Sequence, residues 1–269
     1  MNVRDAGERA DQPRALVRRP SPRLNEGIVT HIDRQPVDVA LAHEQWRGYV
    51  AALQAAGWEP IEVEPADDCP DSVFVEDTMV VYRDVAVIAS PGAPSRRGEL
   101  AGAARAVERQ GYRLAGIEPP GTLDGGDVLK VGNQVYVGRS GRTNTQGIDQ
   151  LSALLAPLGA SVEAVPLTKV LHLKSAVTAL PDGTVIGYPD LVDDPGPFDR
   201  FLAVPEPAGS HVVLLDESRL LMAASAPATA AIFASMGYTP LVVDISEFEK
   251  LEGCVTCLSI RLRPAEVVG

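Results

Sequence analysis

The sequence predicts an α/β fold, a five-bladed α/β propeller of ββαβ units with pseudo-fivefold symmetry. Three observations predict it. A helix-period segment that runs through a glycine into a short strand recurs along the chain, apolar strand pairs around turn residues recur in step with it, and the first and last strands can pair with each other. The alternative is an ordinary α/β sandwich in which the similarity between the segments is accidental.

The helix-to-strand segment occurs four times. The segments are LQAAGWEPIEVE ending at Glu64, VERQGYRLAGIE ending at Glu118, LAPLGASVEAVP ending at Pro166 and FASMGYTPLVVD ending at Asp244. Each contains a glycine where a helix would end in a left-handed residue, which glycine adopts without a Cβ clash: Gly57, Gly111, Gly159 and Gly237. Apolar residues at helical spacing support the first and third helices: Ala42, Trp46, Tyr49, Val50 and Leu53, then Ile148, Leu151, Leu154, Leu155 and Leu158.

Strand pairs are predicted around four turns. They are TMVVY and VAVIA around Arg83-Asp84, DVLKV and QVYVG around Gly132-Asn133, SAVTAL and TVIGY around residues 181–183, and HVVLL and RLLMA around residues 216–218. Apolar, β-branched runs that flank Gly, Asn or Asp turns are typical of hairpins. Each unit is therefore expected to run in the order hairpin, helix, strand.

A fifth unit is expected where the repeat spacing widens. The first three helix-end glycines are 54 and 48 residues apart, whereas the next interval is 78 residues. The segment GPFDRFLAVPE, residues 196–206, is predicted to form a short helix and strand there. The last hairpin would pair VTCLSIRL near the C-terminus with RALVRR near the N-terminus, which removes the exposed sheet edge. Because no linker separates the units, we expect one domain over residues 1–269, with residues 1–13 as a flexible N-terminal tail.

Charge and cysteine content limit the class of protein. The 269 residues carry 24 Lys+Arg against 36 Asp+Glu, a net charge of -12, which argues against a nucleic-acid binder and suits a small cationic partner. The three cysteines, Cys69, Cys254 and Cys257, are too few for a disulfide framework, so a cytoplasmic location is expected. The charged first 14 residues predict no signal peptide, and residues 220–236 are too interrupted to predict a membrane span.

Chemistry-bearing residues come just before the predicted hairpins, and in a ring such positions converge near the axis. They are Glu76-Asp77, Asp124-Gly-Gly-Asp127, the segment from His172 to Ser175, and the segment from Gly253 to Cys257. A cysteine and a histidine from distant parts of the chain, with a carboxylate to orient the histidine, form the pattern of nucleophile, base and orienting acid.

Each of these residues also has a simpler interpretation. Cys257 could be a buried strand cysteine, and with Cys254 it forms a CxxC pair that could be a redox motif or half of a zinc site. The zinc interpretation is weak because there is no second CxxC and there are only four histidines. His172 could simply begin a strand. A turn explains the two glycines between Asp124 and Asp127, but it does not explain both acids.

Acidic and basic segments complete the candidate site. Residues 62–77 contain seven acids and no Lys or Arg, and those of Asp71-Ser-Val-Phe74-Val-Glu76-Asp77 alternate with apolar residues. Buried carboxylates need a cationic partner, and a guanidinium matches them well. Arg96 and Arg142 follow hairpins on loops, where each could bind a carboxylate or be an ordinary surface arginine.

At these residues the sequence resembles dimethylarginine dimethylaminohydrolase. The resemblance runs from about Arg14 to Leu262 and rests on six separated motifs, FVED ending at Asp77, PGAPSRR ending at Arg97, TLDGGD ending at Asp127, RTN ending at Asn144, HLKS ending at Ser175, and Thr256-Cys257. That family belongs to the guanidino-group-modifying (pentein) superfamily of five-bladed ββαβ propellers. Several of the elements are shared with arginine deiminase.

The resemblance implies a dimethylargininase, a hydrolase that converts Nω-methylated arginine to L-citrulline and dimethylamine or methylamine, with no metal or organic cofactor, as a monomer or homodimer. It implies Cys257 as the nucleophile that forms a thiouronium-type intermediate, His172 as the acid and base, and Asp124 as its orienting acid. It implies a set of substrate-binding residues: Asp71 at the α-amine, Glu76 and Asp77 at the guanidinium, Arg96 and Arg142 at the α-carboxylate, Val29 in the covering loop formed by residues 20–29, and Phe74, Ser175, Leu251 and Glu252.

Two departures and two competing functions accompany this assignment. Glu252 stands where mammalian members carry Asp, and the covering loop matches poorly. An arginine or agmatine deiminase releases ammonia instead, but agmatine has no carboxylate for Arg96 and Arg142, and arginine deiminases carry an inserted helical domain. A non-catalytic propeller that binds cationic ligands is the other alternative. Because the abundant carboxylates disfavour a thiolate in the empty site, we expect a cationic substrate to activate Cys257.

Overall fold

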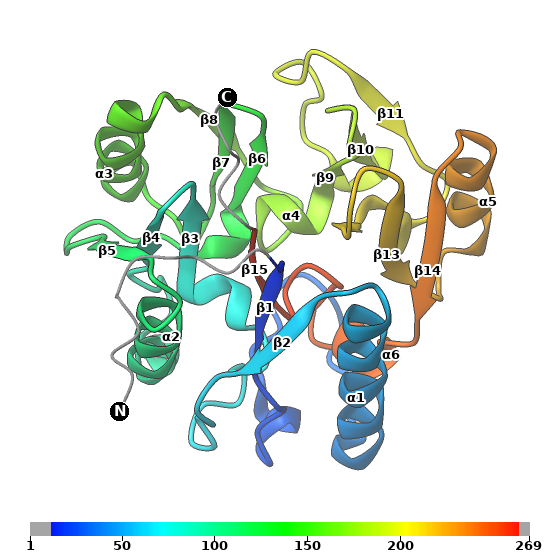
Figure 1. Ribbon diagram of the computed structural model, residues 1–269, viewed down its shortest axis with the longest axis horizontal. Coiled ribbons are helices and arrows are strands. Elements are labelled where there is room, and N and C mark those ends of the chain that lie inside the picture. Colours follow the sequence, from blue (N-terminus) through cyan, green and yellow to red (C-terminus); the bar gives the residue numbers. More distant parts are fainter. Residues whose placement is uncertain (1–11, 264–269) are drawn as a thin grey trace.

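The computed structural model describes residues 12–263, and within them the strands form five separate three-stranded sheets arranged as a ring (Figure 1). In every sheet the middle strand pairs antiparallel with the inner strand and parallel with the outer strand. The expected ββαβ unit and the five-bladed α/β fold are therefore confirmed. Of the expected tail, residues 1–13, residues 1–11 lie outside the described residues.

The sheets follow one another along the chain. The first consists of β15 (Ile260–Leu262), β1 (Arg14–Val17) and β2 (Glu59–Glu62), and the second of β3 (Met79–Tyr82), β4 (Val85–Ile88) and β5 (Arg113–Gly116). The third consists of β6 (Val128–Val131), β7 (Gln134–Arg139) and β8 (Ser161–Pro166), and the fourth of β9 (Val177–Ala179), β10 (Val185–Gly187) and β11 (Phe201–Ala203). The fifth consists of β12 (Val213–Leu214), β13 (Arg219–Ala223) and β14 (Thr239–Val243).

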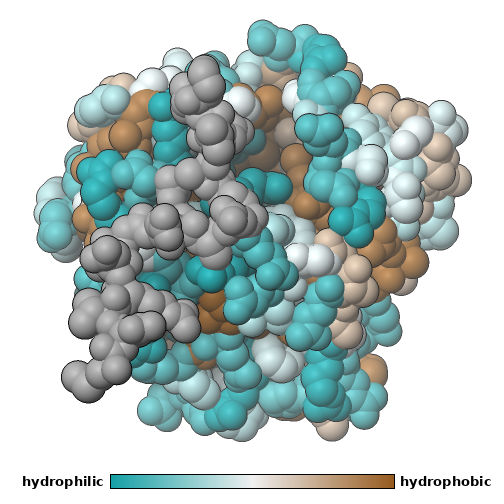
Figure 2. All heavy atoms as spheres, viewed as in Figure 1, coloured by the Kyte–Doolittle hydropathy of each residue, from teal (hydrophilic) through white to brown (hydrophobic). Residues whose placement is uncertain are grey.

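Helices connect the middle strand to the outer strand in four of these sheets and lie on the outside of the ring (Figure 1). They are α1 (Val39–Ala55), α2 (Leu100–Glu108), α3 (Thr145–Leu155) and α5 (Pro227–Ser235). Two single-turn helices, α4 (Leu173–Ala176) and α6 (Ser246–Glu249), precede β9 and β15. Among residues 12–263 no helix is both long and apolar enough to cross a membrane, and hydrophilic side chains dominate the face shown in Figure 2.

The turn chemistry read from the sequence agrees with the backbone. Gly57, Gly111, Gly159 and Gly237 all have positive φ, between 80° and 95°. The β3–β4 turn places Arg83 at φ 52°, and the β6–β7 turn places Gly132 at φ 59°. The ring closes where β1 pairs antiparallel with β15, with Arg14 opposite Leu262, as expected.

The fourth sheet departs from the expectation. Residues 196–206 contain the strand β11 but no helix. The connection from β10 to β11 contains a single short 3-10 helix, Pro189–Leu191. Pro195 and Pro197 surround Gly196, and this composition prevents a regular helix. Aromatic packing occupies the position that a helix has elsewhere, because the Phe198 ring lies 5.0 Å from that of Tyr136 and 6.3 Å from that of Phe201.

The hydrophobic core is divided among the seams between neighbouring sheets. One buried cluster joins Leu16 and Ile260 of the first sheet to Met79 of the second, and another joins Val17 of the first sheet to Leu221 of the fifth. The remaining seams contain clusters of the same kind. Because apolar burial is the main source of stability, each sheet depends on both of its neighbours.

A cavity of about 760 Å³ occupies the axis of the ring, and the inner strands β3, β6, β9, β12 and β15 all contribute to its wall. It extends from Glu76 and Lys174, near the beginnings of the inner strands, to Arg83 and Gly132 at the hairpin turns. The segments that precede the inner strands therefore meet at one end of the axis.

Candidate active site

The candidate site is built by the segments that lead into the inner strands. The 3-10 helix η2 (Val75–Thr78) carries Glu76 and Asp77 into β3, and η4 (Gly125–Asp127) follows Asp124 and leads into β6. His172 precedes α4, which leads into β9, and Cys257 lies in the turn before β15. Backbone hydrogen bonds tie these segments together, since the Glu76 amide donates to the Cys257 carbonyl at 3.2 Å.

His172 lies buried between two carboxylates. Its Nε2 is 3.1 Å from Oδ2 of Asp124, and its Nδ1 is 3.8 Å from Oδ1 of Asp77. Burial by itself would lower the pKa of His172, but Asp77, Asp124 and Asp127 outweigh it and raise the pKa to about 9. The imidazole is therefore a cation at neutral pH and can donate a proton to a leaving group.

Two glycines make this arrangement possible. A Cβ on Gly126 would lie 2.5 Å from Oδ1 of Asp77 and 2.6 Å from Nδ1 of His172, and a Cβ on Gly125 would lie 2.1 Å from the Glu76 carbonyl oxygen. No side chain fits at either position. The Gly126 amide instead donates to Oδ1 of Asp77 at 2.9 Å.

The two acids of the Asp-Gly-Gly-Asp motif have different tasks. Asp124 contacts the His172 ring, whereas Asp127 accepts the Leu173 amide at 3.0 Å and the Ser140 hydroxyl at 2.7 Å. Burial raises the pKa of Asp127 to about 6. The second acid of the motif, which a turn alone did not explain, therefore fixes the backbone that follows His172.

Arg96, which the resemblance assigns to the substrate α-carboxylate, is engaged with acidic side chains and carbonyl groups of the protein. Its guanidinium forms a buried ion pair with Asp77 and a two-pronged pair with Glu99, at 2.9 and 2.7 Å, and it also donates to the carbonyls of Asp71 and Phe74. The Arg96 and His172 cations outweigh the burial of Asp77 and lower its pKa to about 2. Arg96 therefore holds Asp77 ionised and oriented. We call Asp77, Arg96, Glu99, Asp124 and His172 the carboxylate cluster.

Arg142 is the more accessible of the two arginines. Its Nη1 lies 3.3 Å from Oδ2 of Asp124, at the edge of the carboxylate cluster, and the side chain is 11% exposed. The loop that contains Gly92 packs directly against the Arg142 backbone, and the Gly92 amide donates to Oδ1 of Asp124 at 3.2 Å. If Arg142 rotates toward a ligand, the buried Asp124 carboxylate keeps His172 and the Gly92 amide as partners.

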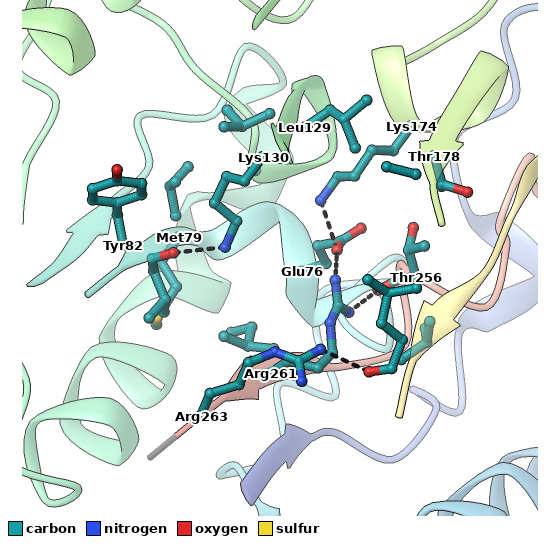
Figure 3. A pocket seen from close by; sticks show the side chains of 18 of the residues that line it. Glu76, Met79, Tyr82, Leu129, Lys130, Lys174, Thr178, Thr256, Arg261 and Arg263 are labelled. Atoms are coloured by element: carbon teal, nitrogen blue, oxygen red, sulfur yellow. Dashed lines mark hydrogen bonds and ion pairs between the residues drawn. The ribbon is translucent and has the colours of Figure 1, made fainter. Parts of the chain in front are cut away.

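Glu76 is paired on one oxygen alone. Lys174 Nζ lies 2.6 Å from its Oε1, and Arg261 donates to the same oxygen (Figure 3). The other oxygen, Oε2, is buried and is one of the few buried polar side-chain atoms of residues 12–263 without a hydrogen-bond partner. An unsatisfied buried carboxylate oxygen is costly, so this atom is available to a cationic ligand.

The cysteine loop, which we define as residues 251–257, brings two thiols together. Sγ of Cys257 lies 3.3 Å from Sγ of Cys254, and both side chains are buried and free. The hydrogen bond with Cys254, burial, and the carboxylates of Glu76 and Asp77 together hold the pKa of Cys257 well above its usual value. Without a bound cation, these surroundings favour the thiol form of Cys257.

Residues 27–31 are held between two acids. Asp71 accepts the Ile28 amide at 3.0 Å, and Glu252 accepts the Thr30 and His31 amides at 2.6 and 2.9 Å. Val29, between these anchors, packs against the core cluster that contains Phe74, Leu251 and Cys257. The Glu252 carboxylate is thus engaged with this segment, and Glu252 itself has φ 59°.

Phe74 and Ser175, two further residues predicted from the sequence, form part of the wall of the site. The Phe74 ring packs edge-on against Phe248, with centroids 6.2 Å apart, and it fills the space where a Cβ on Gly253 would be. Ser175 is part of the turn after His172, and its carbonyl lies 2.9 Å from Nε2 of His211. These contacts shape the wall beside the cysteine loop.

A metal could be considered at Asp77, Asp124 and His172, whose ligand atoms lie within 4.8 Å of one another. However, Arg96 and Arg142 already pair with the two carboxylates. The arrangement therefore balances its charge with guanidinium groups and does not depend on a cation from solution.

Sequence reasoning missed three residues that support the site. Lys174 and Arg261 hold Glu76, and Glu99 holds Arg96. The signal that could have found them is the rule that a buried acid needs a cationic partner, applied to Glu76 as well as to the arginines.

Comparison with known proteins agrees with this geometry. The arginine deiminase family matches residues 58–241. An N(G),N(G)-dimethylarginine dimethylaminohydrolase from Streptomyces coelicolor is 66% identical over 93% of this chain and 97% of its own length, and one from Pseudomonas aeruginosa is 36% identical over 91% of this chain and 98% of its own length. The crystal structure of a variant of the Pseudomonas aeruginosa enzyme with citrulline superposes with a TM-score of 0.86 at 34% identity, covering 94% of this chain and all of that one. Another dimethylarginine dimethylaminohydrolase structure, an adduct with S-methyl-L-thiocitrulline, gives a TM-score of 0.87 at 34% identity over 93% of this chain and all of that one.

Proposed function

Because the chain belongs to the dimethylarginine dimethylaminohydrolase family, we propose that it hydrolyses Nω-methylated arginine to L-citrulline and dimethylamine or methylamine. The observation that carries this proposal is the buried, unpaired Oε2 of Glu76 beside the ionised Asp77, at the point where the segments of His172 and Cys257 meet. This is a site for a planar cation with several N–H donors.

Substrate binding uses four charged side chains. Oε2 of Glu76 and the Asp77 carboxylate accept hydrogen bonds from the guanidinium nitrogens, and Arg142 turns from Asp124 to the α-carboxylate. Asp71 and the backbone at Val29 receive the α-amine, while Phe74, Ser175, Leu251 and Glu252 form the wall and hold the covering segment. Arg96 contributes by fixing Asp77.

The bound cation also activates the nucleophile. A positive charge next to Cys257 lowers its pKa, so the thiolate forms when the substrate is present. The Cys257 sulfur attacks the guanidinium carbon and forms a C–S bond. The C–N bond to the methylated nitrogen then breaks, and protonated His172 gives its proton to the departing amine.

Hydrolysis of the covalent intermediate regenerates the enzyme. His172, now neutral, takes a proton from water, and the hydroxide attacks the same carbon. The C–S bond breaks, the Cys257 thiolate leaves and takes up the proton of the new hydroxyl group, and the neutral ureido group of citrulline remains. Asp124, 3.1 Å from Nε2, holds the His172 ring in place for both proton transfers.

The test compares four possible substrates in parallel: asymmetric dimethylarginine, monomethylarginine, arginine and agmatine. A colorimetric assay for ureido products should give a signal with the first two and much less with the others. Product from arginine alone would identify an arginine deiminase. A calorimetric binding signal for all cations without any ureido product would identify a binding protein.

We also propose that residues 12–263 act as one catalytic domain, since β1 and β15 close the ring, and that the protein works in the cytoplasm as a monomer or homodimer. The three free thiols fit a reducing compartment. Sedimentation of the purified protein over a range of concentrations measures the assembly state.

A further inference from the structure

The cysteine loop places a second thiol beside the proposed nucleophile, and the mechanism above has no use for it. Cys254 lies three residues before Cys257, its Sγ is 3.3 Å from Sγ of Cys257, and its side chain is 3% exposed. The Cys257 amide donates to the Cys254 carbonyl at 3.1 Å, which folds the intervening residues into a turn. The two sulfurs are therefore neighbours because of the backbone and not by chance orientation.

The surroundings of Cys254 keep its sulfur facing Cys257. The Thr256 hydroxyl lies 3.2 Å from Sγ of Cys254, and the Lys174 carbonyl lies 3.9 Å from it on the opposite segment. Both thiols are buried, and Cys257, with 6% of its surface exposed, is the more accessible of the two to a small reagent such as a peroxide.

We propose that Cys254 is a resolving cysteine, which forms a reversible disulfide with Cys257 when a peroxide oxidises the loop. The functional consequence, reversible loss of turnover, rests on the proposed role of Cys257 as the nucleophile. The disulfide itself does not rest on that role. To close the disulfide, the two sulfurs must approach from 3.3 Å to roughly 2.05 Å.

The oxidation balances in two steps. One thiol loses its proton, the resulting thiolate attacks a peroxide oxygen, and the O–O bond breaks. The leaving hydroxide or alkoxide takes up that proton, so the products are a sulfenic acid and water or an alcohol. The neighbouring thiol then attacks the sulfenic sulfur, the S–S bond forms, the S–O bond breaks, and water leaves. Two thiols are oxidised by two electrons and one peroxide is reduced. A dithiol such as dithiothreitol reverses the result by exchange.

The resolving cysteine protects the nucleophile from permanent damage. A lone active-site sulfenic acid can be oxidised further to sulfinic acid, which thiol reductants do not restore. Capture by Cys254 stops this sequence one step earlier. The prediction is therefore an enzyme that loses activity in peroxide and regains it in a reductant.

The experiment treats the full-length protein with hydrogen peroxide and follows mass, thiols and activity. In the wild type we expect a loss of about 2 Da, a peptide in which Cys254 is linked to Cys257, and at least ~80% recovery of activity in dithiothreitol. Cys254→Ser should instead gain about 32 Da at Cys257 and recover little. Cys69→Ser, which changes the remaining buried cysteine away from the loop, should behave like the wild type.

Absence of the linked peptide in the oxidised wild type, or equal recovery of the wild type and Cys254→Ser, would overturn the proposal. Cys254→Ala provides a second test if the serine variant does not fold. The mass and thiol measurements need no turnover, so they separate this proposal from the proposed function. A linked peptide in a protein without hydrolase activity would support the disulfide and contradict the function.

Discussion

The carboxylate cluster and the cysteine loop face the same site but are held in opposite ways. In the cluster every charged group has a partner: Arg96 pairs with Asp77 and Glu99, and His172 lies against Asp124. In the loop the Cys257 thiol has Cys254 as its polar neighbour, and nearby carboxylates oppose its ionisation. The proposed nucleophile is thus the group to which the protein offers no counter-charge, whereas the carboxylates and the guanidinium that stay charged are fixed by ion pairs, and His172, which passes a proton in both directions, is held in place by Asp124.

The largest expected effect comes from replacing the Cys257 thiol. Cys257→Ser should lower kcat by at least ~1000-fold, because a serine hydroxyl next to carboxylates does not ionise. Thermal unfolding should change little, since no ion pair depends on this side chain. Steady-state citrulline production measures the effect, with Cys69→Ser as the control. Turnover within tenfold of the wild type would mean that another residue is the nucleophile.

A substitution at Glu76, which lies between the carboxylate cluster and the cysteine loop, tests whether Oε2 binds the substrate. Glu76→Gln should raise KM for asymmetric dimethylarginine by ~10–100-fold, because it removes the charge offered to the guanidinium. It also leaves Lys174 and Arg261 without their anion and should destabilise the fold by ~3 kcal/mol. Substrate titrations and urea unfolding measure the two effects.

Glu99→Gln is the matched control for this change. Glu99 is equally buried and paired, but both of its oxygens already bind Arg96. This variant should lose stability with a smaller rise in KM. Equal KM values for the two variants would show that Oε2 of Glu76 does not bind the substrate.

Alkaline pH should weaken the carboxylate cluster through His172. Its pKa in the folded protein is about 9, above the ordinary value of roughly 6.5, so its stabilising contribution is complete below pH 6.5 and is lost as pH rises through 9. We expect kcat/KM to fall by ~10-fold per pH unit above 9, and the free energy of unfolding to fall by at most ~3 kcal/mol from pH 6.5 to 10. In His172→Gln the stability change over this range should be much smaller, and an unchanged slope would contradict the assignment.

The smallest expected effect concerns the segment that the cysteine loop holds. Glu252→Gln weakens the acceptor for the Thr30 and His31 amides and should raise KM by ~2–10-fold with little change in melting temperature. Hydrogen exchange of residues 28–31 should become faster. Glu249, in the preceding helix α6, accepts a hydrogen bond from the Ser225 hydroxyl, so Glu249→Gln is the control and should leave KM and hydrogen exchange unchanged. Unaltered exchange in Glu252→Gln would mean that other contacts hold the segment.

Local chemistry predicted the ring well, and the site in part. Turn residues and helix-end glycines have the same conformation wherever they occur, so the four glycines with positive φ could be placed from sequence alone. The irregular connection before β11 could not, because one of its packing contacts, the edge-to-face contact of Phe198, is with Tyr136, which is far away in the chain. For the same reason the sequence brought forward Asp124, His172 and Arg96 but not the ion pairs that fix the role of Arg96. Which buried acid pairs with which buried base depends on how different blades pack together, and the sequence alone does not specify that packing.

The pairing of β1 with β15 has a consequence for how the molecule comes apart. Every apolar seam lies between two sheets, and the closing strand pair makes the last sheet a neighbour of the first. A closed ring has no terminal sheet at which unfolding could begin. Detaching any sheet exposes the apolar seams on both of its sides, so the domain should unfold as a single cooperative unit. It also means that the position of the chain ends is arbitrary: a circularly permuted gene, joined near Arg14 and Leu262 and cut at the turn around Gly183, should encode the same ring.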